Sequence, residues 1–557
     1  MKTGARILLD ELERQGVSTI FGYPGAAVLP VYDELYDSPL RHILVRHEQA
    51  AAHAADGFAR ASGRTGVCLA TSGPGACNLV TGIATAYMDS SPMVAITGQV
   101  ATTLLGNDAF QEADITGITA PITKHTYLVA RTGELARRVR EAFRIAGSGR
   151  QGPVLLDLPK DVLTGTAFDE PDDTPLALRG YRPTVRGNPR QVREAATLIA
   201  AAERPVIYAG GGVIASGASP ELVLLAERLM TPVATTLMAL GAIPGDHPLN
   251  LGMLGMHGTA QANLAVTECD LLIAVGARFD DRVTGRLEAF APRAAVIQID
   301  IDPAEIGKNR AVEVPIVGDA KVVLQQLLAA TGPGSGQEAW HRRWAGWRRT
   351  PSPETTRPGR LVARTVLGAM SELLPADSVV VSEVGQHQMW TAQVFRFRRP
   401  RQWISSGGLG TMGFGLPAAM GAHFARPDLP VFVVAGDGSL QMNIQEFGTL
   451  VQHGIPVKIA VLNNGFLGMV RQWQELFYDR RYAYTELPPV DFVRIARAYG
   501  IDAVRVESEE EVMPALRTAM ETDGPFLMDF RIEREENVFP MVPAGAAINE
   551  MIGGTDR

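Results

Sequence analysis

Two apolar segments of strand length, each followed by small polar residues, constrain the fold more than any other feature of this chain. Residues 431–435 are continuously apolar and run into Gly436-Asp437-Gly438, and residues 457–462 run into Asn463-Asn464. Apolar runs that end in such residues are typical of buried parallel strands followed by tight loops. We expect residues 439–452, between them, to form one helix. The pattern predicts an open α/β sheet.

The loop residues after these strands indicate a metal site. Ligands of open α/β sheets bind outside the carboxyl ends of the strands, where the Asp437 carboxylate and the Asn464 amide oxygen would converge. These hard oxygens suit Mg²⁺, which shares its coordination shell with ligand phosphate and water. Either motif alone is more typical of an ordinary turn. Together, each after a strand, they favour a site for a metal and a diphosphate.

The length of the chain predicts several domains, because 557 residues are too many for one hydrophobic core. Two stretches rich in proline and glycine, 166–187 and 333–357, are predicted to be linkers without regular structure. They divide the chain into domains at 1–165, 188–332 and 358–545, each with alternating strand and helix patterns. We predict the α/β class, with three doubly wound parallel-sheet domains.

The composition excludes several classes of protein. The net charge is −8 and no long run of lysine or arginine occurs, so a nucleic-acid or anionic-membrane surface is not indicated. Cys68, Cys77 and Cys269 show no metal-ligand spacing and are predicted to be reduced core thiols. No apolar run approaches the roughly 20 residues that span a bilayer, and the start resembles no signal peptide. We expect a cytoplasmic protein with no nucleic-acid or membrane partner.

The first and third domains resemble each other locally. A helical segment ending in Phe-Ala-Arg precedes a strand and a glycine-rich loop at residues 53–75, and the same order recurs at 419–438. Any α/β protein could yield such a pair by chance. Only the second copy carries the metal-binding Asp437, whereas the first has an isolated acid, Glu48, directly after the apolar residues 43–45.

These residues together resemble the thiamine diphosphate (ThDP) enzymes. Within that superfamily the chain is most similar to the catalytic large subunits of acetohydroxyacid synthase (acetolactate synthase), and the match extends along almost the whole chain. The motifs that carry it are Phe21-Gly22-Tyr23-Pro24-Gly25, Thr71-Ser72-Gly73-Pro74-Gly75, Asp108-Ala109-Phe110-Gln111-Glu112, Ile122-Thr123-Lys124-His125, Leu158-Pro159-Lys160-Asp161-Val162, Gly255-Met256-His257-Gly258, Arg278-Phe279-Asp280-Asp281-Arg282-Val283, Gly407-Gly408-Leu409-Gly410-Thr411-Met412-Gly413 and Leu467-Gly468-Met469-Val470-Arg471-Gln472-Trp473.

The resemblance implies a ThDP-dependent carboligase, a transferase of branched-chain amino-acid biosynthesis. Such an enzyme decarboxylates pyruvate and ligates the hydroxyethyl unit to a second pyruvate, giving 2-acetolactate, or to 2-ketobutyrate, giving 2-aceto-2-hydroxybutyrate. The implied cofactors are ThDP, Mg²⁺ and an FAD with a structural role. The implied partners are a second copy of the chain, in a homodimer or homotetramer with ThDP between subunits, and a small regulatory subunit.

The resemblance also implies which residues hold ThDP and its metal. The implied Mg²⁺ ligands are Asp437, Asn464 and the backbone carbonyl of Phe466. The implied ThDP contacts are Pro24, Glu48, Gln386, His387, Gly410, Met412, Gly438, Ser439 and Met469. Met412 would be the apolar wedge under the bent cofactor, although a methionine without this motif around it is more often part of a core.

Three residues are implied to be catalytic, namely Glu48, Gln111 and Lys160. The Glu48 carboxyl would favour the imino tautomer of the cofactor's aminopyrimidine. The acceptor substrate would contact Phe110, Met256, Arg282 and Trp473, with the Arg282 guanidinium gripping a carboxylate and Trp473 favouring the larger acceptor. Without the family, a surface ion pair of Arg282 with Asp280 or Asp281 is the better interpretation.

The central domain has a pattern of its own. A strand at 205–209 precedes Gly210-Gly211-Gly212, where backbone could approach a phosphate, and a strand at 295–299 ends at Asp300. Alone this pattern is a weak indication of a dinucleotide site. The resemblance implies FAD contacts at Arg150, Gly210, Gly211, Gly212, Thr236, Leu237, Met238, His257, Gly276, Arg278, Asp280, Arg282, Val283, Asp300, Ile301, Asp319 and Ala320.

Four other functions fit the sequence less well. The catabolic acetolactate synthase without FAD lacks the central FAD pattern, and pyruvate oxidase needs a redox-active flavin and oxygen. Glyoxylate carboligase lacks the carboxylate that Glu48 supplies. A binding or regulatory protein with a degenerate ThDP fold would have no need to keep the set Glu48, Gln111, Lys160, Asp437 and Asn464.

Overall fold

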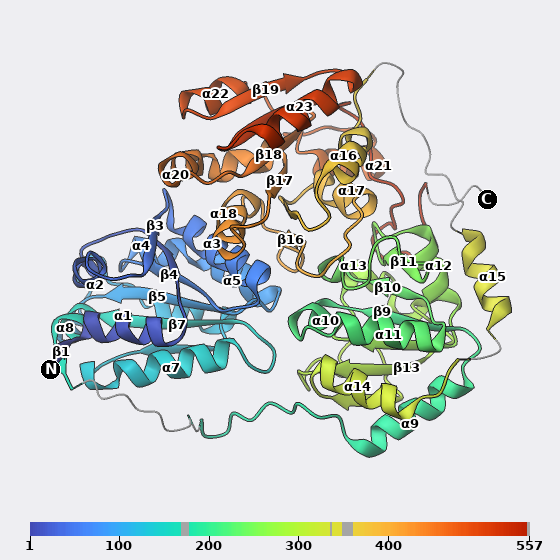
Figure 1. Ribbon diagram of the computed structural model, residues 1–557, viewed down its shortest axis with the longest axis horizontal. Coiled ribbons are helices and arrows are strands. Elements are labelled where there is room, and N and C mark those ends of the chain that lie inside the picture. The colour runs from blue at the N-terminus through green and yellow to red at the C-terminus, as the bar shows by residue number, and fades with distance from the viewer. Residues whose placement is uncertain (169–175, 177, 335–336, 348–359, 554–557) are drawn as a thin grey trace.

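The computed structural model describes residues 1–168, 176, 178–334, 337–347 and 360–553. Three six-stranded parallel sheets form its framework, each with helices on both faces (Figure 1). The predicted α/β class with three parallel-sheet domains is therefore confirmed. Parts of both predicted linkers lie outside the described residues. Within the described ranges, no helix is both long enough and apolar enough to cross a membrane.

The N-terminal domain contains a parallel sheet with the strand order β3-β2-β4-β5-β7-β6. A short antiparallel pair, β1 (Lys2–Thr3) and β8 (Thr166–Ala167), joins its two ends. The sheet strands are β2 (Thr19–Gly22), β3 (Arg41–Leu44), β4 (Gly66–Ala70), β5 (Met93–Gln99), β6 (His125–Leu128) and β7 (Pro153–Pro159). The helices are α1 (Gly4–Arg14), α2 (Leu29–Leu35), α3 (Glu48–Ser62), α4 (Pro74–Asn78), α5 (Val80–Met88), α6 (Ile115–Thr119), α7 (Leu135–Ala146) and α8 (Lys160–Thr164).

The central domain contains a parallel sheet with the strand order β11-β10-β9-β12-β13-β14. Its strands are β9 (Pro205–Ala209), β10 (Val233–Thr235), β11 (Asn250–Met253), β12 (Leu271–Val275), β13 (Ala295–Asp300) and β14 (Val314–Val317). Its helices are α9 (Pro189–Ala201), α10 (Gly211–Ala215), α11 (Ser219–Leu229), α12 (Ala260–Glu268), α13 (Asp281–Thr284), α14 (Ala320–Ala330) and α15 (Glu338–Gly346).

The C-terminal domain contains a parallel sheet with the strand order β16-β15-β17-β18-β20-β19. Counted within each domain, this order is the same as in the N-terminal sheet, so the local likeness of the two domains extends to their topology. The strands are β15 (Val379–Ser382), β16 (Trp403–Ser405), β17 (Val431–Gly436), β18 (Lys458–Asn463), β19 (Asp502–Val506) and β20 (Phe526–Arg531). The helices are α16 (Ala363–Leu373), α17 (Gln386–Val394), α18 (Gly415–Ala425), α19 (Asp437–Leu440), α20 (Phe447–His453), α21 (Gly468–Phe477), α22 (Phe492–Ala498) and α23 (Glu509–Glu521).

In each sheet the strand order reverses next to the first strand of that sheet, and the loops that follow the two neighbouring strands diverge there. The reversal lies between β2 and β4 in the N-terminal sheet, between β9 and β12 in the central sheet, and between β15 and β17 in the C-terminal sheet. Crevices at such points are the usual ligand sites of open α/β sheets. The topology thus places three candidate crevices at the carboxyl edges of three sheets.

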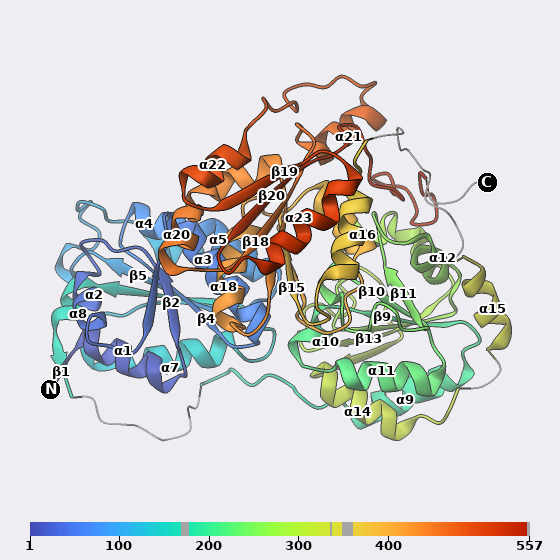
Figure 2. The same cartoon turned by 45° about the horizontal axis from the view of Figure 1, so that its top comes forward.

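Helices α3 and α18 join the outer domains and lie side by side in both ribbon views (Figures 1 and 2). Glycines make the close approach possible. A Cβ atom on Gly57 would lie 2.0 Å from the Ala418 carbonyl oxygen, and one on Gly421 would lie 1.8 Å from the Ala54 carbonyl oxygen. Backbone therefore meets backbone, with alanines around it, and the relative position of the two domains is fixed with little freedom.

Two predictions about helices were wrong. The segment 439–452 is not one helix, because Asn443 leaves the helical conformation (φ −133°) and donates through Nδ2 to the Gly413 carbonyl, 2.6 Å away. The predicted linker 333–357 is not free of regular structure, since it contains α15. That helix forms because Trp340 and Trp344 bury their rings against the central core.

One of the three cysteines also departs from the prediction. Cys68 and Cys269 are buried free thiols, as expected, but Cys77 is exposed. It lies on the short helix α4, whose buried residues are Gly75 and Ala76. The core prediction for Cys77 was therefore wrong.

The packing of α3 on α18 generates a prediction. Gly421→Ala should lower the free energy of unfolding by at least about 2 kcal/mol, because the added methyl group meets a backbone carbonyl that cannot rotate away. Gly368→Ala is the matched control, since Gly368 lies inside α16 and an added Cβ atom there would have no neighbour within 4 Å. It should raise stability by about 0.5–1 kcal/mol. Urea unfolding followed by circular dichroism measures both, and equal effects of the two substitutions would contradict this packing.

Candidate functional site

A cavity lies at the reversal point of the C-terminal sheet, between the loops after β15 and β17. We call it the C-terminal cavity. The residues predicted to bind ThDP and metal in this domain line it, apart from Gly410, which lies on the neighbouring loop. The lining includes Gln386, His387, Met412, Asp437, Gly438, Ser439, Asn464, Phe466 and Met469. Residues from four separate motifs thus meet at one sheet edge.

Asp437 and Asn464 lie at the centre of this cavity, and both are nearly buried. The Asp437 Oδ2 accepts from the Gly465 amide at 3.0 Å, and the Asn464 Oδ1 accepts from the Phe466 amide at 3.1 Å. Burial raises the pKa of Asp437 to about 6, although backbone amides oppose the rise. Within the described residues no Lys, Arg or His forms an ion pair with it. A bound cation would supply the missing positive charge.

Two glycines keep the cavity open. A Cβ atom on Gly436 would lie 2.8 Å from His387 Nδ1, and one on Gly468 would lie 2.1 Å from Gln386 Oε1. The Gln386 Oε1 accepts from Asn464 Nδ2 at 3.2 Å. Burial lowers the pKa of His387 to about 3, and its Nε2 atom is buried without a partner. A close backbone cradle at the start of a helix, here α17, is a feature expected around a diphosphate.

The N-terminal domain carries the predicted catalytic residues at its own sheet edge. Glu48 begins α3 and is half-buried, and its Oε2 accepts from Asn78 Nδ2 at 2.9 Å. Gln111 has a left-handed backbone (φ 59°), and its backbone packs directly against Gly73 of the loop after β4. Such strain in a residue other than glycine is common at functional sites.

Other predicted residues of this domain are open to solvent in the single chain. Lys160 begins α8 on an exposed groove, Pro24 is exposed, and Phe110 exposes 89 % of its side chain. They do not line the C-terminal cavity of the same chain.

The residues predicted for the acceptor lie in three places, of which the exposed Phe110 is one. Met256 and Arg282 lie together, since Arg282 Nη1 is 3.8 Å from Met256 Sδ and the Met256 amide donates to the Arg282 carbonyl at 2.8 Å. Trp473 lies on α21 and packs edge-on against Phe477. The Arg282 Nε atom is also 3.6 Å from Asp281 Oδ2, with both side chains exposed, so the surface ion pair is present as well.

A larger cavity of about 360 Å³ lies at the reversal point of the central sheet. We call it the central cavity. It is also lined by the N-terminal domain, through residues 88–90 and 147–151. Most residues predicted to bind FAD line it, namely Arg150, Gly211, Gly212, Thr236, Met238, Gly276, Arg278, Asp280, Asp300, Ile301, Asp319 and Ala320. Burial raises the pKa of Asp300 to about 6.

The remaining predicted FAD residues lie elsewhere: Gly210, Leu237, His257, Arg282 and Val283 do not line the central cavity. Gly210 has a packing role instead, because a Cβ atom there would lie 2.1 Å from the Gly276 carbonyl oxygen. Gly212 combines both roles, since it lines the cavity and also contacts Gly276. The close approach thus brings the loops after β9 and β12 together.

Sequence reasoning missed Glu383, a fully buried acid at the end of β15. Its Oε2 accepts from the Gly413 amide at 2.8 Å and its Oε1 from the Leu416 amide at 3.1 Å. It thereby fixes the start of α18 and the end of the loop that carries Met412. The signal in the sequence was an acid directly after a buried strand. The role of Glu383 was not visible there, because its hydrogen-bond partners are backbone atoms some 30 residues away.

Comparison with known proteins gives matches along nearly the whole chain. Residues 2–118, 192–327 and 383–530 match the N-terminal TPP-binding, central and C-terminal TPP-binding domains of thiamine pyrophosphate enzymes. The acetolactate synthase of Mycobacterium bovis is 54% identical over 565 residues, which cover 99% of this chain and 91% of the relative. The probable acetolactate synthase large subunit of Methanocaldococcus jannaschii is 52% identical over 562 residues, covering 99% and 95%.

The burial of Glu383 generates a prediction about pH. Burial raises its folded-state pKa from 4.5 to about 7, so the stability it contributes is present below pH 4.5 and is lost as the pH rises through 7. Between pH 5 and 8 the unaltered protein should lose about 3 kcal/mol that Glu383→Gln does not lose. Urea midpoints at the two pH values test this, with the exposed Glu510→Gln as control. Parallel pH profiles for Glu383→Gln and the unaltered protein would refute it.

Proposed function

The chain belongs to the thiamine pyrophosphate enzymes, among the acetolactate synthase large subunits, and we propose that it joins two 2-keto acids. It decarboxylates pyruvate and ligates the hydroxyethyl unit to a second pyruvate or to 2-ketobutyrate, as a ThDP-dependent transferase of branched-chain amino-acid biosynthesis. The observation that carries the proposal is the C-terminal cavity, where the residues expected for ThDP and its metal meet. The identity to relatives over the full chain supports it.

The residues of the C-terminal cavity fit ThDP with a magnesium ion. Asp437, Asn464 and the Phe466 carbonyl would hold the metal, and the buried, unpaired carboxylate of Asp437 is the observation that favours a cation there. Gln386, His387, Gly438 and Ser439 would hold the diphosphate. When bound, ThDP would supply the acidic thiazolium carbon and the electron sink that a 2-keto acid needs to lose CO₂.

The central cavity fits FAD. Its glycine loops admit a close approach of backbone, and Asp300 lies at the end of β13 where an acid could accept from a ribose hydroxyl. Carboligation transfers no net electrons, so the flavin would have a structural role. Because the lining comes from two domains, the flavin would hold the N-terminal and central domains together.

The protein's own groups would bind the substrates and move protons. Glu48 would hold a proton on its carboxyl group, which Asn78 keeps in one orientation. Gln111 and Lys160 would line the approach to the reacting carbon, with the strained backbone of Gln111 fixing its direction. Arg282 would grip the acceptor carboxylate, which would replace the weak exposed pair with Asp281.

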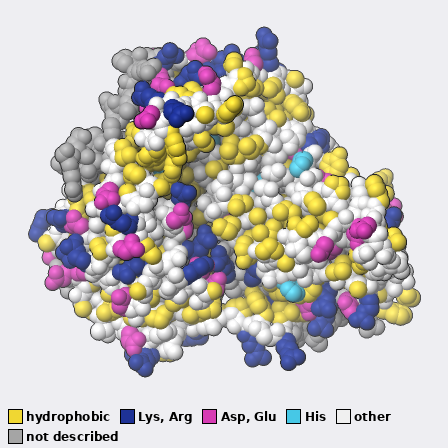
Figure 3. Space-filling view, turned by 180° about the vertical axis from the view of Figure 1, so that it is seen from behind, with side chains coloured by type: hydrophobic (Ala, Val, Ile, Leu, Met, Phe, Trp, Pro, Cys, Tyr) yellow, Lys and Arg dark blue, Asp and Glu magenta, His cyan; other side chains and the backbone are white. Residues whose placement is uncertain are grey.

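A second copy of the chain would complete the site. In Figure 3, the face opposite that of Figure 1, apolar side chains gather over the N-terminal and C-terminal domains, whereas more charged ones lie at the left, over the central domain. Phe110 and Leu409, from loops of the proposed site, are among the exposed apolar residues.

We propose a homodimer as the minimum active unit, able to form a homotetramer, with a small regulatory subunit as a further partner. A cytoplasmic location and the domain boundaries 1–165, 188–332 and 358–545 belong to the same proposal.

An assay of the purified protein with pyruvate, ThDP, Mg²⁺ and FAD tests the proposed function. Acetolactate should form without matching oxygen uptake, and Glu48→Gln should lower kcat by about 10²–10⁴-fold, because the proton transfer loses its carboxyl group. Glu338→Gln, an exposed acid on α15, should retain full activity. Absence of acetolactate would refute the synthase, and stoichiometric oxygen consumption would indicate an oxidase instead.

The choice of acceptor provides a separate prediction for Trp473. In a mixture of pyruvate and 2-ketobutyrate, Trp473→Leu should lower the ratio of 2-aceto-2-hydroxybutyrate to 2-acetolactate by about 10-fold or more, because the indole packs the extra methyl group. Tyr478→Leu removes a nearby exposed aromatic ring and should leave the ratio unchanged. Product analysis by mass spectrometry measures this product ratio. An unchanged ratio in Trp473→Leu would assign the selectivity to other residues.

A further inference from the structure

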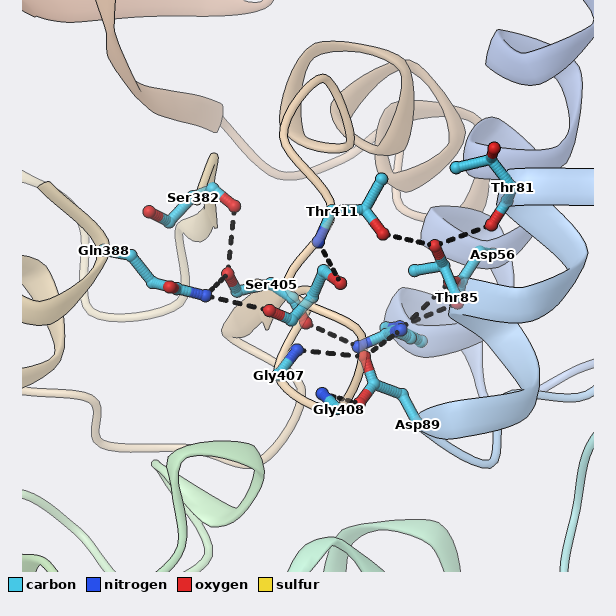
Figure 4. A network of polar contacts seen from close by, with 12 residues as sticks. Asp56, Thr81, Thr85, Asp89, Ser382, Gln388, Ser405, Gly407, Gly408 and Thr411 are labelled. Atoms are coloured by element: carbon cyan, nitrogen blue, oxygen red, sulfur yellow. Dashed lines mark hydrogen bonds and ion pairs between the residues drawn. The ribbon is translucent and has the colours of Figure 1, made fainter. Parts of the chain in front are cut away.

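One acid with a buried side chain, Asp89, lies between the two cofactor cavities. Its side chain is only 1% exposed, and it lines the central cavity directly after α5. The same carboxylate accepts from the Gly407 amide at 3.1 Å and from the Gly408 amide at 2.6 Å (Figure 4). These amides begin residues 407–413, which we call the glycine loop. Asp89 thus contacts the start of a loop from another domain.

One further side chain, that of Arg60, holds Asp89 in place. Arg60 Nη2 donates to Asp89 Oδ2 at 2.9 Å, and Arg60 also forms a two-pronged ion pair with Asp56 at 2.7 and 2.9 Å. The third nitrogen, Arg60 Nη1, donates to the Ser405 carbonyl at 2.7 Å, at the end of β16. A guanidinium whose three nitrogens all donate to fixed acceptors is a rigid support. The support comes from α3, the helix that packs on α18.

The glycine loop carries residues proposed to contact ThDP. Gly410 has a left-handed backbone (φ 70°), and Met412 lines the C-terminal cavity. The Thr411 hydroxyl meets the Thr85 hydroxyl at 2.7 Å, which anchors the middle of the loop to α5. A Cβ atom on Gly407 would lie 2.5 Å from Met238 Sδ, and Met238 lines the central cavity. The glycine loop therefore packs against the lining of the central cavity at Gly407 and lines the C-terminal cavity at Met412.

The neighbouring residue, Ser90, links Asp89 to the opposite side of the central cavity. Ser90 has a left-handed backbone (φ 57°), and its Oγ accepts from Arg150 Nε at 2.9 Å. Arg150 Nη1 in turn pairs with Glu305 at 2.8 Å and Asp302 at 3.2 Å in the central domain. A ligand in the central cavity would contact this chain of groups and also Met238, which packs against Gly407 of the glycine loop.

We propose that Asp89 is a positioning residue that couples the two cavities. A dinucleotide in the central cavity restricts the turn at Asp89 and Ser90, the carboxylate holds the glycine loop, and the loop then presents Gly410 and Met412 to ThDP. FAD therefore raises the affinity for ThDP, and by linkage ThDP raises the affinity for FAD by the same factor. The inference rests on the proposed cofactors. It assigns to the structural flavin the role of positioning the glycine loop.

Binding measurements on the full-length protein, freed of cofactors, test the coupling. The dissociation constant of ThDP with saturating Mg²⁺ is measured with and without FAD, from the fluorescence of tryptophan, since Trp390 lines the C-terminal cavity. In the unaltered protein FAD should lower this constant by about 5-fold or more. The dissociation constant of FAD, followed by flavin fluorescence, should fall by the same factor when ThDP is added.

Asp89→Asn separates the coupling from simple stability. It replaces one acceptor oxygen by an NH₂ group, while Arg60 keeps its pair with Asp56, so the fold should survive. The FAD effect on the ThDP constant should fall to less than about 2-fold. Arg60→Lys, which cannot hold Asp56, Asp89 and Ser405 at once, should give the same result and replaces Asp89→Asn if that variant does not fold.

Two controls keep the inference falsifiable. Thr85→Val loosens the glycine loop without touching the central cavity, so it should weaken ThDP binding with and without FAD and leave the factor between them unchanged. Asp428→Asn, at an exposed ion pair with Arg426, should change neither constant. An equal FAD effect in Asp89→Asn and the unaltered protein, or no FAD effect in the unaltered protein, would overturn the coupling while the synthase assay still stands. Failure to bind FAD or ThDP at all would instead overturn the cofactor proposal.

Discussion

The direct contact between the backbones of α3 and α18 is the constraint on which the rest of the structure depends. With Gly57 and Gly421 at the crossing, no side chain separates the helices, so the outer domains have little room to shift relative to each other. The start of α3 carries Glu48, and the start of α18 follows the glycine loop. Fixing the two helices therefore fixes the distance between the predicted proton carrier and one wall of the C-terminal cavity.

Buried carboxylates add to the constraint that this packing imposes. Buried carboxylates in the molecule fall into two kinds, according to whether a cation accompanies them. Asp56 and Asp89 both form ion pairs with Arg60. Glu383 instead accepts hydrogen bonds from backbone amides, and Asp437 forms no ion pair with a cationic side chain of the described residues. The carboxylates that are paired with a cation hold loops in place. Asp437 is the kind of group that binds a ligand, because a buried acid gains most from a cation.

The sequence predicted the fold class well because its strands are buried on both faces and form continuous apolar runs, as in β9 and β17. Most of the residues that the family resemblance implied for the cofactors in the central and C-terminal domains line the two cavities, and several of them directly follow strands whose ends meet. Sequence-based prediction failed where tertiary contacts decide local structure: Asn443 breaks a helix to reach Gly413, and tryptophans turn a proline- and glycine-rich linker into α15. The roles of Asp89 and Glu383 were beyond its reach because each accepts from backbone amides of a distant segment, which no side-chain pattern records.

The shared strand order of the outer sheets also bears on the symmetry of the chain. Helices α3 and α18 occupy equivalent places, each between the second and third strands of its sheet, so their contact joins like to like. Contacts of that type are made by symmetric pairs of identical subunits. The arrangement therefore has the form of a two-fold pair whose two halves belong to one chain. The two halves nevertheless differ in chemistry, since the first carries the isolated acid Glu48 and the second carries Asp437 and Asn464, the predicted metal ligands.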